Sequence, residues 1–241
     1  MKFAEFLSDA DAERAVATFR KLRRHGQESL ALTGGFAIES HLRMRGQRVE
    51  LRPLNDIDFL AEDFEAIPKT LAGDFIFRHV HPHDAPGKTL LQAVDSETAV
   101  RVDVFRAYGA EMARAETIED AGHPLCMVSI EDLAARSARL SMDLAFGTPM
   151  PAKHARDFQR LLPLVEAAEM EPIWQEHRKP AHPESFAETA ELLRRLIPQR
   201  TDLQIVPDYS RDVEAVCQRC QPAAEFPLAE GERVLALLGY C

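Results

Sequence analysis

Apolar positions in the first half of the chain follow two spacings, one typical of helices and one typical of strands. Residues 12–22 carry apolar side chains at helical spacing, and Ser8 followed by Asp11 indicates where that helix begins. The apolar run 29–33 predicts a short buried strand, and the pattern over residues 36–45 predicts a second helix. Further strands are predicted over residues 57–61, 75–80, 89–94 and 99–105.

The second half of the chain is predicted to be mostly helical. Ser129 with Asp132 three residues on indicates a helix start, and Pro151 suits the first position of a helix that would carry Phe158 and Val165. The two-proline segment 178–185 is the best candidate for a linker. Additional helices are predicted around residues 186–196, 211–220 and 230–238.

This change of character near residue 122 predicts two domains. Residues 1–122 would form an α/β core, and residues 123–241 a helical C-terminal domain, so the fold class is α+β. The length of 241 residues allows this division.

Composition and charge exclude several classes of protein. At 46% hydrophobic and 28% charged residues the chain can bury a sizeable core. Its formal charge of -10 argues against broad, non-specific nucleic-acid binding but permits a local basic groove. The apolar runs are too short for a membrane span, and the acidic N-terminal segment is unlike a signal peptide. Four cysteines do not suggest a disulfide scaffold, so we expect a cytoplasmic protein.

Two aspartates predict a cation site. Asp56 and Asp58 are two residues apart, so on a strand both carboxylates project from one face, about 6–7 Å apart along the chain. Carboxylates this close repel unless a cation lies between them, and oxygen ligands suit Mg²⁺. The alternative is a D-x-D pair on a half-exposed strand edge that has no catalytic role.

A glycine pair and a third aspartate extend this site. Gly34 and Gly35 separate a predicted strand from a predicted helix, where backbone N–H groups and the helix dipole can hold a phosphate. They match neither a Walker A loop nor G-x-G-x-x-G, and such pairs are often only turns. Asp103 lies on a later strand, on the opposite face from Val102 and Val104, and could share a second metal ion or activate a hydroxyl.

These motifs resemble the nucleotidyltransferase superfamily with the polymerase-β-like fold. The segments TGGFAIESHL and RPLNDIDFL look most like the AbiEii/AbiGii toxin-type nucleotidyltransferases. Leu54 departs from the family pattern, which usually has Ser or Thr there. The resemblance spans about residues 30–165 and is carried by Gly34, Gly35, Ala37, Arg52, Asp56 and Asp58, then more weakly by Ser129, Glu131, Asp132, Leu133, Arg136, Lys153, Arg156 and Asp157.

The resemblance implies a small mixed β-sheet core and Mg²⁺-dependent transfer of NMP from an NTP to a hydroxyl acceptor. Asp56, Asp58 and Asp103 would be catalytic and hold one or two Mg²⁺ ions. Lys153 would help hold the nucleotide phosphates and Asp157 would orient it, although an i, i+4 salt bridge explains that pair equally well. Arg52 would be a phosphate ligand or a counter-charge in the acidic site.

The acceptor and the catalytic competence have alternatives. The family implies a toxin that acts on tRNA or another cellular acceptor, with a cognate partner protein possible. An antibiotic adenylyltransferase is an alternative, because the acidic chain suits a cationic aminoglycoside at least as well as RNA. A non-catalytic binding module or antitoxin of the same fold is a third hypothesis.

Histidines and cysteines offer weaker metal signals. His79, His81 and His83 alternate along a predicted strand and could bind Zn²⁺ as in a hydrolase, but Pro82 interrupts the strand. The C-x-x-C pair Cys217 and Cys220, with Cys126 and Cys241 elsewhere, lacks the second ligand pair of a structural zinc site. Buried cysteines are therefore favoured.

Overall fold

The computed structural model describes residues 5–26, 29–62, 67–80, 89–120, 123–199 and 205–206. The chain divides into two compact units that meet in sequence between Val128 and Ser129. No helix of the described ranges is long and apolar enough to cross a lipid bilayer. Several predictions lie outside the described residues: His81, His83, Cys217, Cys220, Cys241 and the helices over 211–220 and 230–238.

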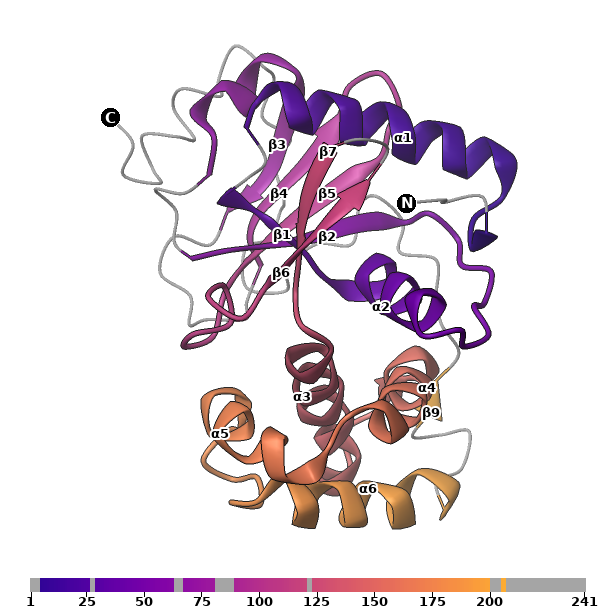
Figure 1. Ribbon diagram of the computed structural model, residues 1–241, viewed down its shortest axis with the longest axis vertical. Coiled ribbons are helices and arrows are strands. Elements are labelled where there is room, and N and C mark those ends of the chain that lie inside the picture. Colours follow the sequence, from indigo (N-terminus) through magenta and orange to yellow (C-terminus); the bar gives the residue numbers. More distant parts are fainter. Residues whose placement is uncertain are drawn as a thin grey trace. The chain divides into compact units, whose positions relative to one another are not determined.

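A seven-stranded mixed sheet forms the first unit, with the strand order β3-β4-β5-β2-β1-β7-β6 (Figure 1). The pairs β1–β7 and β2–β5 are parallel, and the other neighbouring strands are antiparallel. β7 follows residue 122, the boundary expected from the sequence, and is a strand of this sheet. The strands are β1 (Ala31–Leu32), β2 (Asp56–Ala61), β3 (Phe75–Val80), β4 (Thr89–Asp95), β5 (Arg101–Arg106), β6 (Glu116–Asp120) and β7 (His123–Met127).

Within the described residues, the sheet is accompanied by the helices α1 (Asp9–Arg24) and α2 (Gly34–Met44) and by a 3-10 helix, η4 (Lys69–Gly73). The predicted cap of α1 is confirmed, since the Asp11 amide donates to Ser8 Oγ at 3.2 Å. Phe19 of α1 packs against Phe59 of β2, with ring centroids 5.9 Å apart. Because strand side chains alternate between faces, α1 covers the Phe59 face of β2, and Asp56 and Asp58 project from the opposite face.

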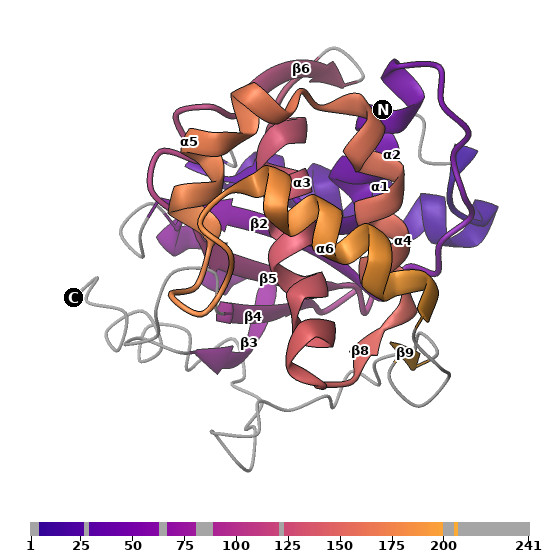
Figure 2. The same cartoon turned by 90° about the horizontal axis from the view of Figure 1, so that it is seen from below.

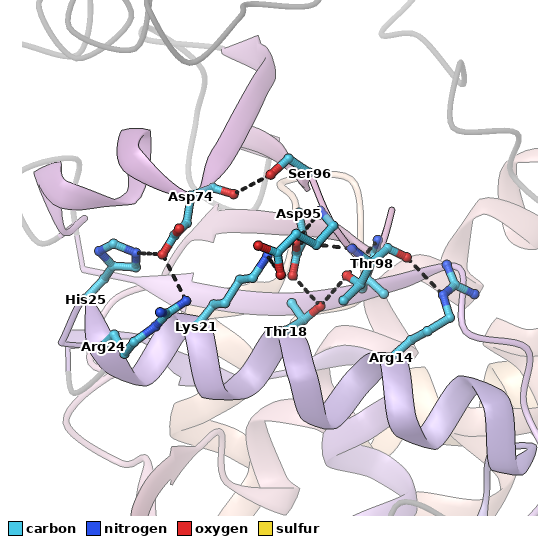
Figure 3. A network of polar contacts seen from close by, with 11 residues as sticks. Arg14, Thr18, Lys21, Arg24, His25, Asp74, Asp95, Ser96 and Thr98 are labelled. Atoms are coloured by element: carbon cyan, nitrogen blue, oxygen red, sulfur yellow. Dashed lines mark hydrogen bonds and ion pairs between the residues drawn. The ribbon is translucent and has the colours of Figure 1, made fainter.

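A buried polar network joins α1 to the end of β4 (Figure 3). Asp95 accepts hydrogen bonds from Lys21 Nζ, from Thr18 Oγ1 at 2.9 Å and from the Glu97 amide at 2.9 Å. Burial alone would raise the pKa of Asp95, but the hydrogen bonds from Lys21, Glu97 and Thr18 outweigh it and lower that pKa. The ion pair with Lys21 therefore stays charged and fixes α1 on the sheet.

The second unit is built of helices around α3. Helix α3 contacts α4, α5 and α6, which surround it in Figure 2. The predicted cap at Ser129 is confirmed, since its Oγ accepts from the Asp132 amide at 3.1 Å. The elements are α3 (Ile130–Ser141), η5 (Met142–Phe146), β8 (Met150–Pro151), α4 (Ala152–Leu161), η6 (Leu162–Leu164), α5 (Ala167–His177), α6 (Phe186–Gln199) and β9 (Ile205–Val206), with β8 and β9 paired in parallel.

These elements confirm the predicted α+β class, a mixed sheet with flanking helices followed by a helical part over the described residues. One helix is shorter than its pattern predicts. Pro151 is the N-cap residue, one position before the first helical residue that it was predicted to be. Helix α4 ends at Leu161 and does not reach Val165. Pro163 explains this end, because its ring cannot donate the hydrogen bond that would continue the helix.

The prediction that residues 178–185 form a linker is wrong. This segment joins α5 to α6 inside the second unit. His182 is 4% exposed and stacks on Trp174 and Phe146, with both ring centroids 5.8 Å away. The Trp174 indole also donates to the Pro183 carbonyl at 3.0 Å. The two prolines therefore shape a packed loop.

Candidate functional site

Three carboxylates converge where β2 and β5 run side by side. The parallel register places Asp58 beside Asp103 and Asp56 beside Arg101. One carboxylate oxygen from each of Asp56, Asp58 and Asp103 lies within 4.8 Å of the other two. Asp103 is only 1% exposed, whereas Asp56 and Asp58 are half-buried. The structure thus forms one acidic cluster from residues far apart in the sequence, and we call these three residues the aspartate triad.

The register also explains why the triad faces one way. Ile57 lies beside Val102, and Phe59 beside Val104, and all four side chains are buried. Since side chains alternate along a strand, burying these apolar residues turns the intervening acidic residues to the other face. The apolar residues of β2 and β5 therefore orient the polar ones.

A buried arginine lies within the triad, and the sequence interpretation did not assign it a role. Arg101 is 1% exposed; its Nη2 pairs with Asp56 Oδ2, and its Nε lies 3.1 Å from Asp103 Oδ1. The only signal in the sequence was the position of Arg101 on the same face of the strand as Asp103. Its charge offsets part of the repulsion between the carboxylates.

The first glycine of the pair touches the triad. Gly34 begins α2 with a φ of +63°, and a Cβ at this position would lie 2.0 Å from Asp58 Oδ2. The Thr33 amide donates to the Asp58 carbonyl at 2.8 Å, which ties the loop before the helix to β2. Only glycine combines this backbone conformation with such a close approach, so the N-terminus of α2 and the Asp58 carboxylate are adjacent.

The second glycine lies under Arg52. A Cβ on Gly35 would be 3.1 Å from Arg52 Nη1. Arg52 Nε donates to Glu39 Oε1 at 2.7 Å, and the Glu50 amide donates to Glu39 Oε2 at 3.1 Å. Glu39 is fully buried on α2, and its hydrogen bond to Nε helps hold the guanidinium beside the start of the helix. The sequence interpretation did not include Glu39.

A histidine anchors α2 to the sheet. His41 Nε2 donates to the Val128 carbonyl at 2.8 Å, and Arg45 Nη1 donates to His41 Nδ1 at 2.9 Å. Burial lowers the pKa of His41, and Arg45 lowers it further against the opposing effect of the Val128 hydrogen bond. The imidazole is therefore neutral and structural.

The remaining predicted site residues belong to other elements of the chain. Lys153 and Asp157 are on α4 in the second unit, where Asp157 is buried. Their proposed part in nucleotide binding stays a prediction. His79 lies in β3 opposite Gln92, and its two partners for zinc binding fall outside the described residues. Cys126 lies on β7, and burial raises the pKa of its thiol.

The donor set of the triad fits a hard divalent cation. Carboxylate oxygens are the side-chain ligands that Mg²⁺ prefers, usually one or two of them with water and substrate phosphate completing the shell. The adjacent N-terminus of α2 offers backbone N–H groups and the positive end of the helix dipole to an anion. A cation site therefore lies beside a potential phosphate site.

No protein-family model matches the chain, and no curated protein matches it either. Solved structures similar to it include ANT(2″)-Ia in complex with adenylyl-2″-tobramycin, 18% identical, with 67% of this chain and 95% of that chain covered at a TM-score of 0.43. An antigenic nucleotidyltransferase-like protein from Paracoccidioides brasiliensis is also 18% identical, with 84% and 96% covered at a TM-score of 0.43. JHP933 from Helicobacter pylori is 14% identical, with 97% and 93% covered at a TM-score of 0.37. Because these identities and TM-scores are low, the function has to follow from the residues of this chain.

Proposed function

We propose that the chain is a Mg²⁺-dependent nucleotidyltransferase that moves NMP from an NTP to a hydroxyl acceptor. The observation that carries this proposal is the aspartate triad, with oxygens within 4.8 Å of one another, directly beside the N-terminus of α2. The sequence resemblance to toxin-type nucleotidyltransferases supports the same reaction.

The residues of the triad have separate tasks in this reaction. Asp56 and Asp58 would hold Mg²⁺, which supplies charge to offset the negative phosphates when it is bound. Asp103 would accept the proton of the acceptor hydroxyl. The acceptor oxygen then forms a bond to the α-phosphorus of the NTP, and the bond from that phosphorus to the pyrophosphate oxygen breaks. The products are the nucleotidylated acceptor and pyrophosphate.

Phosphate binding is assigned to the start of α2. The backbone amides at Gly34 and Gly35 and the guanidinium of Arg52 lie together there, and Glu39 orients that guanidinium. Backbone amides at a helix N-terminus and a guanidinium both favour phosphate oxygens. We assign Lys153 and Asp157 a supporting role in nucleotide binding from the sequence resemblance alone.

Two versions of the proposal differ in the acceptor that receives the NMP. The toxin-type version predicts transfer to tRNA or another cellular acceptor and allows a cognate partner protein. The antibiotic version predicts transfer to an aminoglycoside hydroxyl, which the acidic charge of the chain favours through attraction of a cationic drug.

A binding experiment tests the nucleotidyltransferase class. The melting temperature of the full chain is measured with each of the four NTPs and Mg²⁺, for the wild type, Asp56→Asn and the control Asp9→Asn, which alters an exposed residue of α1. We expect at least one NTP with Mg²⁺ to raise the melting temperature of the wild type and of Asp9→Asn but not of Asp56→Asn. No shift with any NTP, or an unchanged shift in Asp56→Asn, would contradict the proposal.

A transfer assay then identifies the acceptor. Radiolabelled NTPs are incubated with the chain and either total tRNA or a panel of aminoglycosides. Label that moves to tRNA supports the toxin-type version, and label that moves to a drug supports the antibiotic version. If NTP binds without transfer to either class, a non-catalytic binding module becomes the better description. Transfer that survives Asp103→Asn would remove Asp103 from its proposed role as base.

A further inference from the structure

Arg101 is the unusual member of the candidate site. An arginine that is 1% exposed lies on the same strand as Asp103 and contacts two of the three triad carboxylates. A buried charge is costly unless it is paired, and pairing with both Asp56 and Asp103 meets that need. The same contacts meet the opposite need of the carboxylates, which repel each other at this separation.

The triad and Arg101 together carry a charge that one divalent cation can balance. If all three carboxylates are ionised, their charge and that of the guanidinium sum to two negative charges in the absence of nucleotide. One divalent cation neutralises that charge. Without Arg101 the same carboxylates would carry three negative charges, more than one divalent ion neutralises.

We propose that Arg101 is a positioning residue that serves as a permanent cation of the triad, in place of a second divalent ion. In the metal-free protein it holds Asp56 and Asp103 together, and in the metal-bound protein one ion suffices before nucleotide enters. The claim about the metal-bound protein rests on the proposed function. The claim about the metal-free protein rests on the ion pairs of Arg101 alone.

The first test measures melting temperature in EDTA and in excess Mg²⁺ for the wild type, Arg101→Gln and Arg101→Lys. The control is Arg24→Gln, which removes an exposed arginine that pairs with Asp74. Breaking a buried ion pair typically lowers the melting temperature of a domain of this size by roughly 10 °C. We expect that loss for Arg101→Gln in EDTA, substantial recovery in Mg²⁺, partial retention in Arg101→Lys and little change in Arg24→Gln.

The second test counts ions by titrating the nucleotide-free wild type with Mn²⁺. We expect one bound ion per chain. Two ions bound with Arg101 in place would overturn the inference, and so would a Mg²⁺-induced shift in Arg101→Gln no larger than that of the wild type. In the latter case Arg101 would act through packing.

A double variant separates this inference from the proposed function. In EDTA, adding Asp56→Asn to Arg101→Gln removes one of the carboxylates that repel, so it should restore part of the lost stability even if no metal ever binds. If neither Mn²⁺ nor Mg²⁺ binds the wild type, the proposed function fails together with the claim that one ion suffices. The double variant then decides whether Arg101 holds Asp56 and Asp103 together in the metal-free protein. If Arg101→Gln fails to fold, folding of the double variant supports the charge role, and failure of both variants overturns it.

Discussion

Gly34 and Asp58 are in such close contact that a single methyl group would not fit between them. A Cβ on Gly34 would lie 2.0 Å from Asp58 Oδ2 and 2.8 Å from its Cγ. The start of α2 and the acidic face of β2 are therefore built against each other, and the absence of a side chain at residue 34 sets the position of the Asp58 carboxylate.

We expect Gly34→Ala to abolish Mg²⁺-dependent NTP binding, because the new methyl group displaces Asp58 or the start of α2. The chain offers a matched control in Gly46→Ala. The φ angles of the two glycines are similar, +63° at Gly34 and +68° at Gly46. A Cβ on Gly46, however, would have no atom within 4 Å. Both variants should lose about 1 kcal/mol of stability from the left-handed backbone.

Only Gly34→Ala should lose the thermal shift produced by NTP and Mg²⁺. Urea unfolding of Gly46→Ala measures the backbone cost alone, any further loss in Gly34→Ala measures the clash with Asp58, and the ligand-induced shift measures the effect on binding. Equal ligand responses in the two variants would show that contact with Asp58 is unimportant for the site.

Glu39 is predicted to act on nucleotide binding through Arg52. In Glu39→Gln the amide keeps an oxygen for one hydrogen bond but loses the charge that holds the guanidinium, so Arg52 is less well ordered beside Gly35. We expect KM for NTP to rise about tenfold, equivalent to about 1.4 kcal/mol, with a smaller change in kcat. Steady-state kinetics measures both constants.

The control for Glu39 is Glu5→Gln. Glu5 pairs with Arg43 at 3.5 Å, and both side chains are about one-third exposed, so this variant should leave KM unchanged. A fall in kcat alone for Glu39→Gln would instead place Glu39 in the chemical step.

Local sequence patterns were sufficient for the elements and for part of the site. Ser8 and Ser129 were recognisable as helix caps because the capping hydrogen bond spans only three residues. The two-residue spacing of Asp56 and Asp58 was readable because strand side chains alternate, and their proximity to Gly34 agrees with the order strand, glycine pair, helix. Each inference needed only neighbouring residues.

Arg101 and Glu39 show where local pattern was insufficient. Arg101 stands beside Asp56 only because β2 and β5 pair in one particular parallel register, which depends on the whole sheet. Glu39 sits in a helix whose pattern would suit a charged residue on a solvated face, yet it is buried by the segment that carries Arg52. Likewise, the prolines of residues 178–185 indicated a linker. The stacking of His182 on Trp174, which makes the segment a packed loop, is a tertiary contact that the local pattern does not reveal.

The ion pair between Lys21 and Asp95 is predicted to contribute strongly to the stability of the first unit. Both side chains are buried, so among the described residues Asp95→Asn leaves the Lys21 ammonium with the exposed Glu97 carboxylate, at 2.9 Å, as its one ionic partner. We expect a loss of about 3 kcal/mol, measured by urea unfolding. Adding Lys21→Met should recover more than half, because it removes the stranded charge.

Asp11→Asn is the matched control for this prediction. Its pair with Arg14 is partly exposed, so its loss should be below about 1 kcal/mol.

Because the pKa of Asp95 is lowered in the folded chain, the contribution of Asp95 to stability is present at neutral pH and is lost as the pH falls below the ordinary carboxyl pKa. A double variant no more stable than Asp95→Asn would contradict the charge explanation.

His182 is predicted to make the second unit sensitive to mild acid. Burial, with a smaller effect of Lys179 and Arg139, lowers the pKa of His182 to about 4, and the Lys179 amide donates to its Nδ1 at 3.3 Å. Nδ1 must be unprotonated to accept that bond. The unfolded chain takes up the proton near the ordinary pKa of about 6.5, so stability is fully present above that pH and declines down to about 4.

The expected loss over this range is on the order of 2 kcal/mol, and Trp174 reports it directly. Trp174 is the single tryptophan of the chain and stacks on His182, so its fluorescence follows unfolding of this unit. In His182→Phe an aromatic ring is kept between Trp174 and Phe146 but cannot be protonated, so urea midpoints between pH 7 and pH 4.5 should vary less than in the wild type. An equally steep pH dependence in both proteins would assign the acid sensitivity to groups other than His182.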